Sequence, residues 1–160
     1  MEPLRALFDH HFWATDTLIA HCAALPPDAW QATVPGTAGT IHHTLVHLVG
    51  ADGRYLGLLT GATPAVQASA PPPLDQLRTH FAGQVRQWQA ALDRADELDV
   101  TIPARGDRPE MPHARNLLLV QALHHGNDHR THVGTILGAC NLPNVDVSGW
   151  AYWSARHAAP

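Results

Sequence analysis

One stretch, residues 117–140, constrains the fold of this chain more than any other. Its residues recur with the three- and four-residue spacing of a buried helical face. That predicted face consists of Leu118, Ala122, His125, His129, His132, Ile136 and Ala139. Three histidines fall in its middle, where a buried imidazole without a hydrogen bond or a metal ion costs about 1–3 kcal/mol. The pattern predicts one long helix that carries chemistry on its inner side.

The spacing of these histidines suits the binding of one cation by two of them. His125 and His129 are four residues apart, so both imidazoles lie on one helical face about one turn apart. His129 and His132, three residues apart, form an alternative pair. His125 and His132 lie roughly 10 Å apart along the axis, too far to share an ion easily. This helix therefore offers two ligands and needs a third from elsewhere, unless its histidines simply bond to polar neighbours in the core.

Three further segments have the periodicity of amphipathic helices. They span residues 3–24, 40–60 and 74–97. Thr40 is predicted to cap the start of the second helix and Gly61 to end it. Residues 61–73 contain four prolines and predict an irregular crossover, long enough for the third helix to run parallel to the second or to cross the end of the bundle. Residues 28–39 are predicted as a loop, and residues 98–111 as a turn or short hairpin.

Four long helices and no strand-rich block predict an all-α four-helix bundle, with a long crossover between helices 2 and 3 and a short C-terminal segment. A length of 160 residues suits a single domain spanning residues 1–160. Cofactor sites in such bundles form from side chains of facing helices. The second helix is the expected source of a third ligand, and both His43 and His47 lie on it. Spacing alone does not choose between them.

Composition excludes several classes of partner. The formal charge is −4, from 10 basic and 14 acidic residues, and no Lys/Arg cluster offers a surface for nucleic acid. No apolar run approaches the roughly 20 residues needed to cross a bilayer, so no membrane partner is expected. The N-terminus lacks the pattern of a signal peptide, which predicts a cytoplasmic protein. Trp150, Tyr152 and Trp153 are candidates to cap the core, to line a pocket mouth or to form a homodimer contact.

Three segments together resemble a known family. TLVHLVGADGRYLGLL and HHGNDHRTHVGTIL resemble the DinB/YfiT-like metal-binding bundles, whose pattern is one histidine in the second helix and H-x-x-x-H-R in the fourth. FWATDTLIAHCAALPPDAW is similar to the opening helix of that family. The likeness covers nearly the whole chain in the order and length of its helices, and it implies a metal-binding four-helix bundle.

The resemblance also implies a ligand set. Matched residue by residue, His47, His125 and His129 take the places of the family's three metal ligands, which favours His47 over His43. The family often follows H-R with Gly-Gln, whereas this chain has Thr-His at those positions. His132 is therefore a candidate for a fourth ligand or for a group that hydrogen-bonds to one.

Three histidines with an open position form the arrangement of a catalytic rather than a structural site, because structural zinc is usually closed by four protein ligands. Imidazole suits several divalent metals, and we expect zinc or nickel. The resemblance implies a metal-dependent transferase that activates a low-molecular-weight thiol of the bacillithiol or mycothiol type for attack on an electrophile. A divalent ion supports this chemistry because it deprotonates a coordinated thiol. No residue besides the ligands is assigned a catalytic role.

Two alternatives remain at the level of sequence. A metal-dependent hydrolase would use bound water, whose pKa a metal lowers to about 7, and would need a nearby general base. Gly126 stands where zinc proteases carry a glutamate, and both Asp52 and Asp128 are rotated away from the neighbouring predicted ligands. The other alternative is a non-catalytic metal-binding protein of a stress response. Turnover of a thiol with an electrophile would distinguish it from the transferase.

Overall fold

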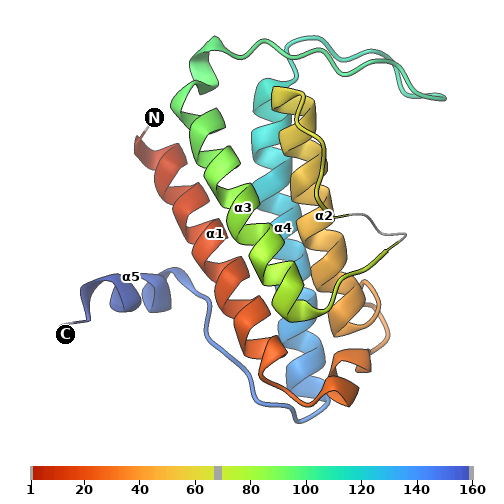
Figure 1. Cartoon of the computed structure of the whole chain (residues 1–160), viewed down its shortest axis with the longest axis vertical. Coiled ribbons are helices and arrows are strands. Elements are labelled where there is room, and N and C mark those ends of the chain that lie inside the picture. Colours follow the sequence, from red (N-terminus) through yellow and green to blue (C-terminus); the bar gives the residue numbers. More distant parts are fainter. Residues whose placement is uncertain (1, 67–69, 159–160) are drawn as a thin grey trace.

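Four long helices run side by side in the computed structural model, which describes residues 2–66 and 70–158 (Figure 1). They are α1 Glu2–Ala23, α2 Ile41–Thr60, α3 Leu74–Asp93 and α4 Arg115–Ala139. Two short 3-10 helices, η1 Pro27–Gln31 and η2 Ala95–Glu97, lie in the connections, and α5 Gly149–His157 follows the bundle. The predicted all-α bundle is confirmed.

Each bundle helix packs mainly against two others. α1 contacts α3 and α4, and α2 contacts the same two helices from the opposite corner. α2 and α3 run in the same direction, as the long crossover between them allows (Figure 1). The largest fully buried side chains include Trp88, Phe8 and Phe81. Burial of each large apolar side chain contributes about 1.5–3 kcal/mol, so the shared core holds the four helices together.

The ends of α2 follow from local chemistry. The Thr40 side chain accepts a hydrogen bond from the backbone N–H of His43 at 3.1 Å, and such a cap contributes about 1 kcal/mol. Gly61 adopts a left-handed backbone conformation with φ of 78°, which residues that carry a Cβ rarely adopt. Both predicted caps are confirmed. They fix the extent of the helix that carries His47.

The buried face of α4 differs from the predicted face. Its buried residues are Leu118, Leu119, Ala122, Gly126, Arg130, Val133, Ile136 and Leu137. His125, His129 and His132 lie half-buried at one edge of this face, and Ala139 is exposed. The prediction was wrong here because a count of apolar residues passes over Gly126 and Arg130. Both turn toward α1, which α4 contacts along with α2.

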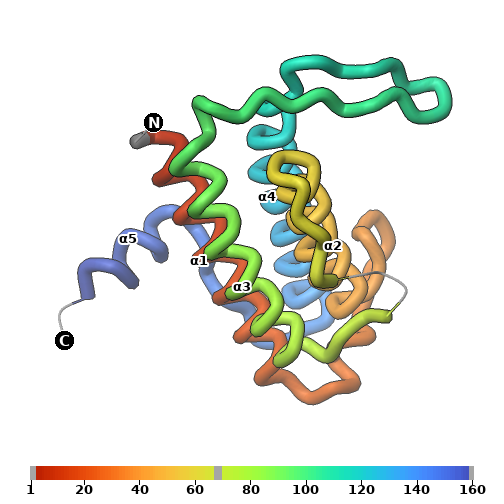
Figure 2. Tube along the Cα trace, turned by 45° about the horizontal axis from the view of Figure 1, so that its top comes forward, coloured from red at the N-terminus to blue at the C-terminus, as the bar shows by residue number. Residues whose placement is uncertain are grey.

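The connections and the C-terminal segment add detail to the predicted scheme. The predicted loop at 28–39 contains η1, and the predicted third helix ends at Asp93 before η2. Backbone pairing between Ile102 and Met111 confirms a hairpin, which projects beyond the bundle (Figure 2). Among the described residues, no helix is both long and apolar enough to span a membrane.

α5 was not predicted, and it lies beside α1 (Figures 1 and 2). The Ser148 side chain caps its start by accepting a hydrogen bond from the Ala151 N–H. Tyr152 packs against the rings of His10 and Trp13 on α1. Trp150 and Trp153 are 85% and 60% exposed, so these two aromatic residues do not cap the core.

Gly126 of α4 lies directly against the His11 side chain of α1. A Cβ placed on this glycine would lie 2.3 Å from Cε1 and 2.6 Å from Nδ1 of His11, closer than real Cβ contacts occur. No side chain fits at this position unless His11 or one of the helices moves. The close contact therefore requires glycine.

We predict that Gly126→Ala lowers the free energy of unfolding by about 1–3 kcal/mol, because the added methyl group overpacks the contact with His11. Denaturant unfolding monitored by circular dichroism measures the change. Gly138→Ala on the same helix is the matched control, since a Cβ there meets no atom within 4 Å. Equal stability of the two variants would show that the α1–α4 contact tolerates a methyl group and does not require glycine.

Candidate metal centre

Three histidines from two facing helices converge on one point. His47 comes from α2, whereas His125 and His129 come from successive turns of α4. The Nε2 atom of His125 lies 3.1 Å from Nε2 of His47 and 3.0 Å from Nε2 of His129. One ring nitrogen of each residue lies within 4.8 Å of those of the other two. The structure thus brings together the three residues that the resemblance selected, and we call them the histidine triad.

The triad has the donor set and spacing of a cation site. An imidazole nitrogen has one in-plane direction, which holds either a lone pair or an N–H. His125 Nε2 therefore cannot form two straight hydrogen bonds, to His47 and to His129, at the same time. A cation accepts a lone pair from all three. Nitrogens bound to tetrahedral zinc at about 2.0–2.1 Å lie about 3.3 Å apart, slightly more than the 3.0 and 3.1 Å between the triad nitrogens.

The surroundings keep the triad in its ligating form. Burial, followed by the neighbouring charges of His125 and His47, lowers the pKa of His129 from 6.5 to about 4. Burial is also the largest cause of the lowered pKa of His125 and of His47, and Arg54 lowers both further. Only neutral imidazole binds a metal ion. At neutral pH all three residues are therefore ready to donate a lone pair.

Two of the other ring nitrogens of the triad lack hydrogen-bond partners among the described residues. Nδ1 of His125 and Nδ1 of His129 are enclosed and have no hydrogen-bond partner among the described residues. Nδ1 carries the proton when Nε2 binds a cation. Each enclosed N–H then lacks an acceptor, at a cost of about 1–3 kcal/mol that ligation must offset.

The two competing histidines lie outside this group. His43 is exposed and stacks on His47, with ring centroids 6.3 Å apart and an angle of 16° between the rings. The ring of His132 lies 5.6 Å from that of His129, and His132 is absent from the cluster of ligand atoms. Tyr55 meets His125 edge to face, at 5.7 Å between centroids.

No carboxylate belongs to the cluster within the described part of the chain. Asp52 turns away from the triad and accepts a hydrogen bond from His11. The exposed Asp128 pairs with His124 at 3.2 Å. Both aspartates are therefore engaged elsewhere, as their predicted rotation away from the ligands implied.

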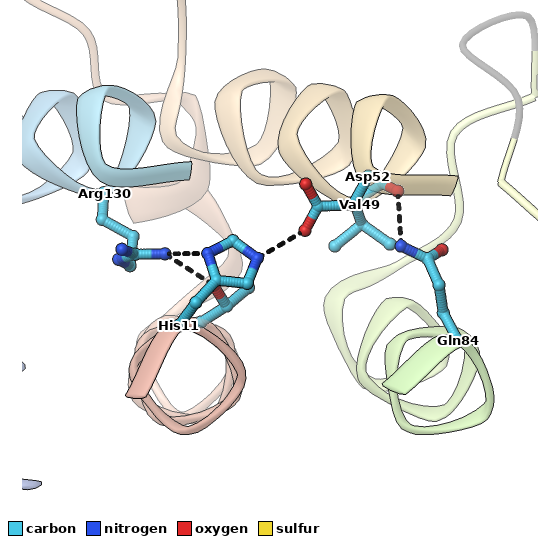
Figure 3. Close-up of polar contacts among 6 residues, drawn as sticks. His11, Val49, Asp52, Gln84 and Arg130 are labelled. Carbon is cyan, nitrogen blue, oxygen red and sulfur yellow. Dashed lines mark hydrogen bonds and ion pairs between the residues drawn. The ribbon is translucent and has the colours of Figure 1, made fainter. Parts of the chain in front are cut away.

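A buried polar network next to the triad escaped the sequence analysis (Figure 3). Arg130 Nη1 donates to His11 Nδ1 at 2.9 Å and to Thr15 Oγ1 at 3.0 Å. Arginine offers only donors, so His11 Nδ1 must accept the hydrogen bond from Arg130. The His11 proton therefore lies on Nε2, which donates to Asp52 Oδ2 at 2.8 Å. His11 is only 1% exposed.

The network connects three helices, since Asp52 lies on α2, His11 on α1 and Arg130 on α4. Burial lowers the pKa of Arg130 to about 10, which leaves the guanidinium charged at neutral pH, and Asp52 opposes the effect of burial. The one feature of the sequence that could have indicated this network is Arg130, which directly follows His129. A second polar contact, from Gln84 Nε2 to the Val49 carbonyl at 3.2 Å, joins α3 to α2 (Figure 3).

We predict that the metal-free protein loses stability as pH falls from about 6.5 to about 4. Between these values the unfolded chain binds a proton at His129 that the folded chain excludes, so acid favours unfolding. The contribution of His129 to the free energy of unfolding is fully present above about pH 6.5. It declines as the pH falls toward the folded pKa of about 4. Urea unfolding at a series of pH values measures this slope.

His129→Gln should flatten the slope because it removes the shifted group. His80→Gln, at an exposed position on α3, is the control and should leave the slope unchanged. A profile that is the same for His129→Gln and the unaltered protein would show that the triad does not cause the acid sensitivity.

Comparison with known proteins adds one positive finding. A model of the DinB family matches residues 1–139, a stretch that runs from the start of α1 to the end of α4. The matched stretch includes the whole triad and the polar network beside it. No curated protein matches the chain. Because the family match covers most of its length, the chain belongs to the DinB family.

Proposed function

We propose that this protein binds a divalent metal ion through His47, His125 and His129, with zinc or nickel as the metal. The observation that carries the proposal is the convergence of three Nε2 atoms at 3.0 and 3.1 Å, which hydrogen bonds alone do not satisfy. Burial supports it further because it keeps the imidazoles neutral. Imidazole nitrogen suits zinc and nickel, whereas magnesium and calcium prefer oxygen.

We further propose that the metal activates a low-molecular-weight thiol for transfer to an electrophile. Three protein ligands leave a coordination position for a substrate, as in catalytic zinc sites. A divalent ion there lowers the pKa of a bound thiol, so that a thiolate forms at neutral pH. The positive charge of Arg54, which acts on both His47 and His125, also favours an anionic ligand at this position.

The protein side chains contribute by holding the ligands in place. The Arg130–His11–Asp52 network joins α4 to α2, the two helices that supply the triad. Gly126 leaves the room beside α4 that the His11 ring of this network occupies. A hydrolase has less support, because Asp52 and Asp128 are paired elsewhere and neither joins the cluster as a general base.

Metal binding is expected to need all three histidines. His47→Ala, His125→Ala and His129→Ala should each lower the metal content of the purified protein at least tenfold while helical content stays nearly unchanged. Elemental analysis and circular dichroism provide the two readouts. His43→Ala is the matched control on α2 and should retain metal. Loss of metal from His43→Ala with retention by His47→Ala would reverse the assignment of the ligand on α2.

Thiol activation is tested spectroscopically. A bacterial low-molecular-weight thiol added to the cobalt- or nickel-loaded protein should produce a charge-transfer band from thiolate to metal, because sulfur enters the open position. The band should be absent from His125→Ala. A panel of such thiols that causes no spectral change in the fully metal-loaded protein would reject the transferase and favour a non-catalytic metal-binding protein.

A further inference from the structure

The side of α4 opposite the triad is hollowed. A groove of about 620 Å³ runs between α4, His10 of α1 and the segment 144–149. Gly134 lies nine residues after His125, which at about 100° per residue is roughly half a turn around the helix. The groove and the triad therefore occupy opposite sides of the buried face of α4, and a ligand in one does not fill the other.

Among the described residues, Arg130 contributes the only arginine or lysine side chain that lines this groove. Its side chain is nearly enclosed, with 6% exposure for the residue. Nη1 is fully used by His11 and Thr15, and no described residue accepts a hydrogen bond from Nε or Nη2. The rest of the guanidinium points away from His11 (Figure 3). An edge with Nε and Nη2 free is the geometry that binds a carboxylate through two parallel hydrogen bonds.

The far wall of the groove is fixed to the bundle. His10 Nε2 donates to the Val147 carbonyl at 3.0 Å, and Asn144 Nδ2 donates to the Gly134 carbonyl at 3.5 Å. Ser148 caps α5, whose Tyr152 packs on α1. The segment 144–149 is therefore held in place by contacts with α1, α4 and α5. This wall of the groove has a defined position.

Several other polar groups that line the groove offer acceptor oxygens. Asp146 Oδ1 accepts a hydrogen bond from the Ser148 N–H, and this contact lowers the pKa of the carboxyl group, which stays charged. The hydroxyl groups of Thr131 and Thr135 donate to backbone carbonyls of α4, so their lone pairs remain free. The groove thus combines one cation at its buried side with a carboxylate and hydroxyl oxygens.

We propose that this groove binds a small polar carboxylic acid, with the carboxylate on the free edge of Arg130 and ammonium or hydroxyl donors directed to Asp146. A phosphate group fits less well, since its second negative charge would meet the carboxylate of Asp146. None of the residues that line the groove belongs to the triad, so the acid would not be a ligand of the metal ion.

The test is an NMR titration of the full-length protein with acetate, glycine, 4-aminobutanoate and inorganic phosphate in turn. We expect saturable shifts in the backbone amides of Thr131, Gly134 and Ser148, with an amino acid binding more tightly than acetate or phosphate. The two amino acids differ in length because the span from Arg130 to Asp146 decides which fits. Failure of all probes to produce saturable shifts would overturn the proposal, and tightest binding of phosphate would overturn the choice of a carboxylate.

Gly134→Leu supplies a steric block. A Cβ at Gly134 meets no atom within 4 Å, so the leucine enters the groove without disturbing the core. Gly138→Leu, one turn further along, has equally open space and does not line the groove, which makes it the matched control. Binding should be lost in Gly134→Leu and retained in Gly138→Leu, with metal content unchanged in both. Shifts that persist in Gly134→Leu would place the ligand elsewhere.

Two charge variants test the assigned roles. Asp146→Asn, at an exposed position, should remove the preference for an amino acid over acetate while acetate binding is kept or strengthened. Arg130→Lys should weaken all carboxylates at least tenfold, and circular dichroism establishes that the variant is folded. An unchanged preference in Asp146→Asn, or unchanged affinity in folded Arg130→Lys, would contradict the proposed orientation of the bound acid between Arg130 and Asp146.

Discussion

The hydrogen bonds from Arg130 through His11 to Asp52 are the interaction on which the rest of the structure depends. Removing one partner of a buried charged pair typically costs about 3–5 kcal/mol, because it leaves the other charge buried and alone. The three residues come from three helices, and their bonds form only when those helices are in one register. Asp52 shares α2 with His47, and Arg130 directly follows His129. The register that satisfies the network is therefore the one that brings the triad together.

Burying the triad costs free energy. Its imidazoles are half-buried with lowered pKa values, and two enclosed Nδ1 atoms lack partners among the described residues. Such a cluster opposes folding more than it favours it. A ligand that binds the folded state alone stabilises it in proportion to the logarithm of its concentration above Kd. The apolar core and the Arg130 network must hold the three rings in place before that stabilisation is available.

The parts of the fold that depend on apolar periodicity and local chemistry were predictable from sequence. These include the four helices, the crossover and the caps at Thr40 and Gly61. The buried face of α4 was not predictable in this way, because Gly126 and Arg130 are core residues that no hydrophobic pattern indicates. The burial of His11 depends on partners 41 and 119 residues away, and no local rule predicts such contacts. The choice of His47 over His43 came from family resemblance and not from spacing.

The distance along the chain between the members of the triad affects when the site can exist. His47 and His125 are separated by 78 residues, and α3 with its two long connections lies between them. Chains emerge from the ribosome N-terminus first, so α1, α2 and α3 are complete before either histidine of α4 appears. Closing so long a loop also carries an entropic cost that the apolar core must meet first. We therefore expect a metal ion at this site to bind after the bundle has assembled, rather than to nucleate the fold as zinc does in a zinc finger.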